Sequence, residues 1–158
     1  MNISTPDILV VGGAGYIGSY VVKALRDAGR QPVVFDNLST GLRENLFPEI
    51  PFIHGDLLIP EQVRVAMRGI RSVIHLAALK AAGDSMLEPE RYALNNLNGT
   101  VNLLHAAGTA GVRHFVFSSS AAVYGEPQYL PLDENHPTEP TNFYGQTKLQ
   151  IEMLLSWF

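Results

Sequence analysis

Short apolar runs alternate along the chain with longer segments in which apolar residues recur every three to four positions. The short runs, rich in β-branched and aromatic residues, predict buried strands, and the longer segments predict helices. We expect strands at 8–11, 32–35, 52–54, 73–76 and 114–117. We expect helices at 17–28, 60–67, 89–110 and from about residue 142 onward, with an irregular loop over 125–142. This alternation is typical of βαβ units, so the predicted fold is α/β, with a doubly wound parallel sheet.

The composition is that of a globular protein, and the length predicts one domain over residues 1–158. Apolar residues make up 46% of the chain and charged residues 16%, which excludes a disordered protein. The net charge of −4 comes without a basic stripe and disfavours nucleic-acid binding. The absence of cysteine excludes disulfides and thiolate-bound metals. The five histidines lack the spacing of metal ligands, so we expect no metal.

No pattern in the sequence indicates a membrane protein or a secreted one. No apolar run reaches the roughly 18 residues that a membrane-spanning helix needs. Residues 1–7 contain neither a basic segment nor a long apolar one, so no secretory signal is predicted. We therefore expect a cytoplasmic protein that does not bind membranes.

A glycine-rich turn connects the first predicted strand to the first predicted helix. Gly13, Gly15 and Gly18 satisfy the pattern G-x-G-x-x-G, and Gly12 precedes them. Glycines permit a tight turn and let backbone amides approach a pyrophosphate at the positive end of a helix. A tight turn without a ligand is the alternative, but the flanking strand and helix favour dinucleotide binding.

Three charged residues follow the ends of other predicted strands. Asp36 could accept hydrogen bonds from the adenosine ribose and repel a 2′-phosphate, which favours NAD over NADP. The alternative is that Asp36 only opens a turn. Asp56 could bind an adenine amino group, or it could cap a helix or close a turn. Lys80 could reach the phosphates of a cofactor or substrate, or it could be an ordinary solvated lysine.

Tyr144 and Lys148 stand four residues apart on the last predicted helix and therefore share a face. The phenol of a tyrosine has a pKa of about 10, and a neighbouring ammonium favours its phenolate, which can act as a general base toward an alcohol. Ser120, at the end of the fifth predicted strand, could bond the reacting oxygen. The alternatives are a surface Tyr–Lys pair and a serine that caps a turn.

These motifs together resemble the extended short-chain dehydrogenase/reductase family, which contains NAD-dependent epimerases and dehydratases. The resemblance covers essentially the whole chain. It rests on the segments GGAGYIG (12–18), DNLSTG (36–41), GDL (55–57), HLAALKAAGDS (75–85), NNLNGT (95–100), FSSSAAVYG (117–125) and NFYGQTKL (142–149). The fold that the resemblance implies is a Rossmann-like NAD-binding domain.

The resemblance also implies roles for individual residues. Tyr144 would be the proton acceptor, Ser120 its partner on the substrate oxygen, and Lys148 the group that tunes Tyr144. The implied contacts to NAD are Gly12, Gly13, Gly15, Tyr16, Ile17, Gly18, Asp36, Asn37, Asp56, Leu57, Lys80, Asn95 and Lys148.

The implied activity is an isomerisation at C4 of a UDP-sugar, such as the interconversion of UDP-glucose and UDP-galactose. The sugar is transiently oxidised to a 4-keto form, and NAD is restored in each turnover. Dehydratases of the family usually carry an acidic pair beside the active-site Ser or Thr, whereas Ala121 and Ala122 follow Ser120 here, which favours an epimerase. Two alternatives remain: another nucleotide-sugar oxidoreductase or dehydratase, and a non-catalytic NAD-binding module. The joint presence of Ser120, Tyr144 and Lys148 argues against the module.

Members of the family are considerably longer than this chain and carry a C-terminal domain for the UDP-sugar. We therefore expect an N-terminal fragment that is truncated before the last strands of the sheet and is inactive by itself. The full-length protein is expected to form a homodimer.

Overall fold

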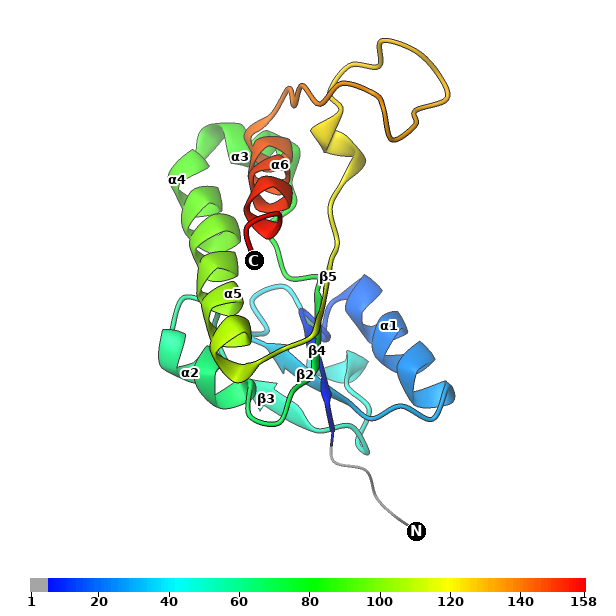
Figure 1. The fold of residues 1–158 in the computed structure, drawn as a ribbon, viewed down its shortest axis with the longest axis vertical. Coiled ribbons are helices and arrows are strands. Elements are labelled where there is room, and N and C mark those ends of the chain that lie inside the picture. The colour runs from blue at the N-terminus through cyan, green and yellow to red at the C-terminus, as the bar shows by residue number, and fades with distance from the viewer. Residues whose placement is uncertain (1–5) are drawn as a thin grey trace. The chain divides into compact units, whose positions relative to one another are not determined.

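The computed structural model describes residues 6–158 (Figure 1). The prediction that no secretory signal is present falls mainly on residues 1–5 and so lies outside the described residues. The described chain divides into two compact units. The sheet unit comprises residues 6–78 and 101–118, and the helical unit comprises residues 79–100 and 119–158.

All five predicted strands are present in the sheet unit, and they are parallel. They are β1 (Ile8–Val11), β2 (Pro32–Asp36), β3 (Phe52–His54), β4 (Ser72–His75) and β5 (His114–Phe117). The strand order is β3-β2-β1-β4-β5. From β1 the chain adds β2 and β3 on one side and then β4 and β5 on the other, so the switch point lies between β1 and β4. Open α/β sheets bind ligands at such a switch point, outside the carboxyl ends of the strands. The predicted doubly wound sheet is confirmed, with bounds that differ by one residue at β2 and β4.

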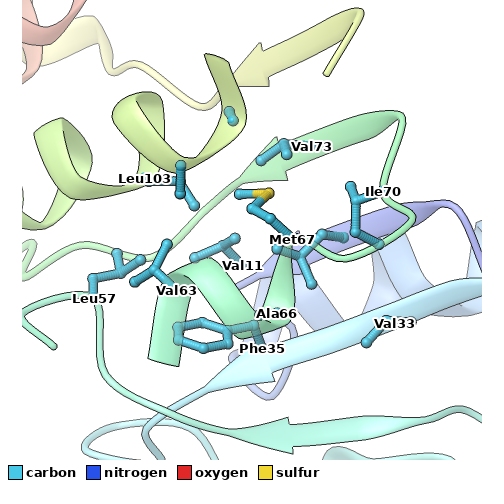
Figure 2. Close-up of a cluster of buried hydrophobic side chains, with 13 residues drawn as sticks. Val11, Val33, Phe35, Leu57, Val63, Ala66, Met67, Ile70, Val73 and Leu103 are labelled. Atoms are coloured by element: carbon cyan, nitrogen blue, oxygen red, sulfur yellow. The ribbon is translucent and has the colours of Figure 1, made fainter. Parts of the chain in front are cut away.

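Alternate side chains of the strands enter two separate cores, one on each face of the sheet. Leu9 and Val11 of β1 belong to a core that also contains side chains of two helices (Figure 2). Ile8 and Val10 pack instead with Val22, on the helix that follows β1. Successive side chains of a strand point to opposite faces, so a run of four apolar residues fills both cores. The main helices of this unit are α1 (Tyr16–Asp27), α2 (Pro60–Ala66) and α5 (Gly99–Ala110), with a 3₁₀ turn η1 (Arg43–Asn45).

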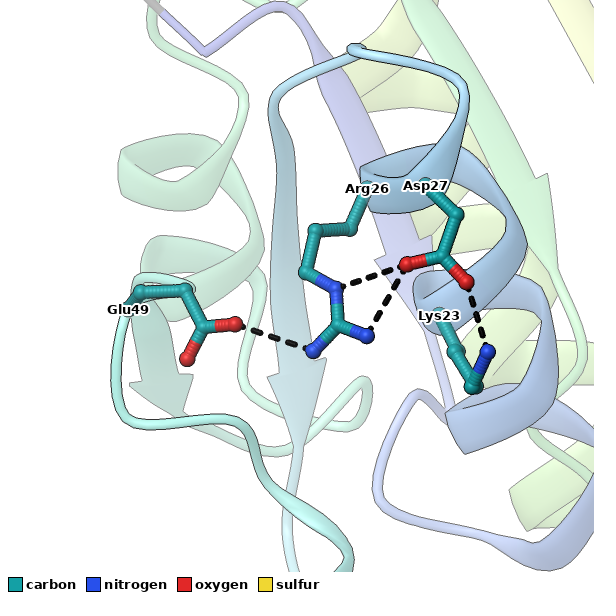
Figure 3. A network of polar contacts seen from close by, with 4 residues as sticks. All are labelled: Lys23, Arg26, Asp27 and Glu49. Carbon is teal, nitrogen blue, oxygen red and sulfur yellow. Dashed lines mark hydrogen bonds and ion pairs between the residues drawn. The ribbon is translucent and has the colours of Figure 1, made fainter.

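An exposed ion network connects the end of α1 to the segment before β3 (Figure 3). Arg26 donates to Asp27 at 2.9 Å and to Glu49 at 2.9 Å, and Lys23 donates to Asp27 at 2.6 Å. The guanidinium of Arg26 also lies 4.4 Å from the ring centroid of Phe47. Exposed ion pairs stabilise a fold only slightly, so the stability of this unit depends mainly on its two cores.

The helical unit differs from the prediction in two places. Its elements are α3 (Ala82–Leu87), α4 (Pro89–Tyr92), the π-helix η2 (Ala93–Asn98), the 3₁₀ turn η3 (Ala121–Val123) and α6 (Phe143–Leu155). The sequence did not predict α3. The helix predicted over 89–110 is continuous, but its middle is the π-helix, a rare geometry that often occurs at functional sites. No helix within residues 6–158 is long and apolar enough to cross a membrane.

The predicted irregular loop is present, and it is folded around a buried histidine. His136 is 4% exposed, and its Nε2 accepts a hydrogen bond from the backbone N–H of Gln128 at 2.9 Å. Its Nδ1 lies 2.8 Å from the carbonyl oxygen of Pro137, which can only accept, so Nδ1 carries the proton of a neutral ring. The rings of Tyr124 and Tyr129 flank His136, with centroids at 5.4 Å and 4.7 Å.

Candidate functional site

The predicted glycine turn lies between β1 and α1, at the switch point of the sheet. Gly12 has a positive φ of 83°, and a Cβ there would stand 2.7 Å from the backbone nitrogen of Ala77. A Cβ at Gly18 would stand 2.1 Å from the carbonyl oxygen of Gly12. The fold itself therefore requires glycine at both positions, at Gly12 because the segment after β4 packs against the turn and at Gly18 because α1 does.

A side chain at Gly15 would meet less steric conflict than one at Gly12 or Gly18. The surroundings of Gly15 fit a bound phosphate group. A Cβ on Gly15 would come no closer than 3.3 Å to the carbonyl oxygen of Gly12. Gly15 is the N-cap of α1 and has no side chain that could bond the N–H groups of the first turn. That turn also holds no acidic residue. Tyr16 and Ile17 of that turn are 76% and 60% exposed. An uncapped helix N-terminus offers N–H groups and a positive dipole end to an anion, so the turn fits the pyrophosphate of a dinucleotide.

Asp36 ends β2 with its side chain buried against the glycine turn. Its Oδ2 accepts from the backbone N–H of Ala14 at 3.0 Å, and its Oδ1 accepts from that of Leu38 at 2.8 Å. The bond from Leu38 forms the turn that the sequence left as an alternative. Each carboxylate oxygen can still accept a second hydrogen bond, so the turn and a ribose contact are compatible.

Asn37 and Asp56 follow neighbouring strands and bond to each other. The Nδ2 of Asn37 donates to Oδ2 of Asp56 at 3.0 Å. Oδ1 of Asp56 accepts from the backbone N–H of Leu58 at 2.8 Å, so Asp56 does close a turn, while its adenine contact stays a prediction. Leu57 is 9% exposed with its side chain in the core, which leaves only its backbone for a cofactor.

In the helical unit, Lys80 is exposed, and Asn96 bonds the backbone of the preceding residue, Leu79. The backbone N–H of Leu79 donates to Oδ1 of Asn96 at 2.9 Å, and its carbonyl accepts from Nδ2 at 3.0 Å. Nδ2 of Asn96 also donates to Oγ1 of Thr147 at 3.1 Å, and Asn95 donates to Oδ1 of Asn96 at 2.9 Å. Asn96 was not among the site residues predicted from the sequence. The signal that could have found it is an amide on the apolar face of a predicted helix.

The first turn of α6 presents Tyr144 and packs closely against η3. The Oγ of Ser85, on α3, accepts from the backbone N–H of Tyr144 at 3.0 Å. A Cβ at Gly145 would stand 2.5 Å from the carbonyl oxygen of Ala122, so no side chain separates α6 from η3 there. Ser120 is the N-cap of η3. The turn that Ser120 caps and the turn that carries Tyr144 are therefore in direct contact.

Lys148 follows Tyr144 by one helical turn on the same face of α6, as the spacing predicts. Its Nζ lies 5.9 Å from the ring centroid of Tyr144. Lys148 is only 3% exposed, and this burial lowers the pKa of its ammonium to about 8, while the carboxylate of Glu152 opposes the shift. A buried amine with such a pKa is typical of functional sites, and the roles of both residues stay predictions.

Two of the serines after β5 have different partners. Oγ of Ser120 accepts from the backbone N–H of Ala122 at 3.2 Å, so Ser120 does cap a turn. Its hydroxyl hydrogen takes no part in that bond and can be donated to a substrate oxygen. Ser119 donates its hydroxyl hydrogen to Oε1 of Glu152, on α6. The sequence analysis had not identified Glu152.

The described residues include no cluster of three or more His, Cys, Asp or Glu side chains that could hold a metal. His75 is 1% exposed and lies near two aromatic rings, with its centroid 6.2 Å from that of Phe115 and 5.7 Å from that of Phe117. Nε2 of His54 lies 3.2 Å from the carbonyl oxygen of Asn37.

The chain is similar to known proteins along nearly all of its length. Residues 8–158 match the model of a family described as the NAD dependent epimerase/dehydratase family. The UDP-glucose 4-epimerase of Streptomyces lividans is 46% identical over 151 residues, which cover 94% of this chain and 46% of that protein.

Solved structures of similar proteins have the same fold. The UDP-glucose 4-epimerase of Brucella ovis in complex with NAD aligns with a TM-score of 0.93 and 41% identity over 96% of this chain and 47% of that one. The UDP-glucose 4-epimerase of Thermotoga maritima with UDP-glucose aligns with a TM-score of 0.92 and 36% identity over 96% of this chain and 50% of that one. The chain thus spans about half the length of the relatives it matches.

Proposed function

Because this chain belongs to the NAD-dependent epimerase/dehydratase family, we propose that it carries the NAD-binding and proton-transfer residues of an enzyme that interconverts UDP-glucose and UDP-galactose. The observation that carries the proposal is the pair of Tyr144 and Lys148 on α6, with Nζ 5.9 Å from the ring centroid. The direct packing of the Ser120 turn against the same helix end supports it. The choice of substrate is supported by relatives named UDP-glucose 4-epimerase at 46% and 41% identity.

In this proposal the sheet unit binds the adenosine and pyrophosphate of NAD. The first turn of α1, from Gly15 to Gly18, offers its N–H groups to the pyrophosphate, because no side chain caps them. Asp36 accepts from the ribose hydroxyls and repels the 2′-phosphate of NADP. When bound, NAD⁺ would accept the hydride from C4 of the sugar and return it to the opposite face. Further proposed contacts are those of Gly12, Gly13, Tyr16, Ile17, Asn37, Asp56, Leu57, Lys80 and Asn95.

Tyr144 is the proposed general base. Its phenolate oxygen takes the proton of the 4-hydroxyl as the sugar is oxidised, and gives it back as the 4-keto sugar is reduced. The ammonium of Lys148 favours the phenolate by its positive charge. Because the pKa of Lys148 is about 8, most of this lysine keeps its charge at neutral pH. The hydroxyl of Ser120 donates to the same sugar oxygen and holds it beside the phenolate.

Ala121 and Ala122 distinguish this proposal from a dehydration. They stand beside Ser120, where dehydratases of the family usually carry an acidic pair, and their methyl groups can neither donate nor accept a proton. Oxidation and reduction at C4 need no such pair. We also propose that the protein acts in the cytoplasm and that the full-length enzyme is a homodimer.

A chimera tests the proposal directly. In the chimera, residues 8–158 replace the matching half of the Streptomyces lividans relative. The chimera is loaded with NAD, and its conversion of UDP-galactose to UDP-glucose is followed by NMR. The chimera should convert the sugar without added reductant and release no stoichiometric NADH. Tyr144→Phe in the chimera should lower kcat by roughly 10²–10⁴-fold, the usual contribution of a general base.

Tyr20→Phe is the matched control, since Tyr20 is 63% exposed on α1 and the change again removes only a phenolic hydroxyl. This control should retain the activity of the chimera. A chimera that melts cooperatively and binds NAD but converts no UDP-sugar would contradict the proposed function. Activity of Tyr144→Phe within a few-fold of the chimera would remove Tyr144 from the mechanism.

A further inference from the structure

One face of α6 carries a third polar side chain beyond the two of the proposed proton transfer. Tyr144, Lys148 and Glu152 follow one another at intervals of four residues, so their side chains share a face of the helix. Glu152 is half-buried and accepts the hydroxyl hydrogen of Ser119 at Oε1. Ser119 directly precedes Ser120 in the chain, so the carboxylate of Glu152 is linked to the segment that positions Ser120.

Glu152 also acts on Lys148 through its charge. Burial lowers the pKa of Lys148 to about 8, and the negative charge of Glu152 is the influence that raises it. The elements packed against α6 are η3, η2, α3 and α4, and their titratable side chains are Asp84, Glu90, Arg91 and Tyr92. Lys148 and Glu152 stand four residues apart on α6, the spacing at which opposite charges on a helix interact.

We propose that Glu152 is a positioning residue for the proposed epimerase reaction: its carboxylate holds the Ser119–Ser120 segment against α6 and keeps Lys148 protonated. This inference rests on the proposed function. A neutral amide could accept the same hydrogen bond from Ser119, but only a carboxylate adds a negative charge that stabilises the ammonium of Lys148. One side chain thus supports both partners of Tyr144: Ser120 indirectly, through the hydrogen bond to the preceding Ser119, and Lys148 through its charge.

The two contributions are separated by substitution. Glu152→Gln keeps an acceptor for Ser119 and removes the charge, whereas Ser119→Ala keeps the charge and removes the link. Glu134→Gln is the matched control, because Glu134 is exposed on the loop between η3 and α6.

The measurement is the titration of the lysine side chains by NMR, through the ¹³Cε signals of the chain labelled at lysine. The chain has three lysines, Lys23, Lys80 and Lys148, so each signal is assigned by a single Lys→Arg change. The midpoint of Lys148 should lie near 8 in the unsubstituted chain. It should fall by about half a pH unit or more in Glu152→Gln, because the ammonium loses its stabilising charge. It should not move in Glu134→Gln.

In Ser119→Ala the carboxylate is free to turn toward water, so the Lys148 midpoint should also fall, by less than in Glu152→Gln. A midpoint in Glu152→Gln equal to that of the unsubstituted chain would overturn the proposal. If Glu152→Gln does not melt cooperatively, the test rests on Ser119→Ala. A Lys148 midpoint that is unchanged or raised in Ser119→Ala would then overturn the proposal.

Glu152→Gln should also move the alkaline limb of the pH–kcat profile of the chimera to lower pH. A merely structural role of Glu152 would not shift this limb. The lysine titration needs no turnover. A chimera without epimerase activity but with the expected titrations would therefore contradict the proposed function and leave the coupling of Glu152 to Lys148 intact.

Discussion

The buried ammonium of Lys148 should lower the free energy of unfolding at neutral pH. Burial lowers its pKa from the ordinary 10.5 to about 8. That difference, at ~1.36 kcal/mol per pH unit, corresponds to about 3 kcal/mol. The folded chain releases this proton near pH 8 and the unfolded chain only near pH 10.5. Between these values the unfolded state binds more protons, so the contribution of Lys148 to stability is least favourable below pH 8 and improves as pH rises to 10.5.

Lys148→Met tests this reasoning, because methionine keeps an unbranched chain without the charge. Urea unfolding followed by circular dichroism gives the free energy of unfolding of both proteins at several pH values from about 7 to 10.5. The stability of Lys148→Met relative to the unsubstituted chain should fall by about 3 kcal/mol over this range. Other groups that titrate in the range are the same in both proteins and cancel in the difference.

Lys80→Met is the control, since it makes the same change at an exposed lysine. A difference for Lys148→Met that does not depend on pH would refute the reasoning, because it would mean that the ammonium of Lys148 is solvated in the folded state. The expected result would show that the chain gives up stability to keep a lysine beside Tyr144, as functional sites often do.

Three further changes test other parts of the site. Gly18→Ala places a Cβ 2.1 Å from the carbonyl oxygen of Gly12, so thermal melting should show a destabilisation of at least roughly 1–3 kcal/mol and calorimetry a loss of NAD affinity. Asp36→Asn removes the charge that repels a 2′-phosphate, so the ratio of NADP to NAD affinity should rise in calorimetry, and an unchanged ratio would assign Asp36 to the turn alone. His136→Phe keeps an aromatic ring but leaves the part-buried N–H of Gln128 without its acceptor, so urea unfolding should show a loss of roughly 1 kcal/mol, whereas unchanged stability would mean that water replaces the ring nitrogen.

The sequence predicted those features of the protein that depend on local or periodic patterns. The five strands were predicted because each is a short apolar run, which identifies the partly exposed edge strands β3 and β5 as well as the fully buried β1 and β2. The glycine turn was predicted because its motif is contained in one strand–turn–helix unit, where Gly12 has a positive φ and Gly18 lies against the carbonyl oxygen of Gly12. The shared face of Tyr144 and Lys148 follows from helical spacing alone.

The tertiary structure decided the features that depend on contacts between distant residues. The bond from Asn96 to Thr147 joins positions 51 residues apart, and the bond from Ser119 to Glu152 joins positions 33 apart. The π-helix and α3 likewise went unpredicted, since hydrophobic spacing does not distinguish a π-helix from an α-helix. Periodicity shows that a polar side chain lies on a buried face, but its partner is set by whichever segment the fold brings against that face. For the same reason the sequence could place Lys148 beside Tyr144, while only the packed structure removes its ammonium from water and lowers its pKa.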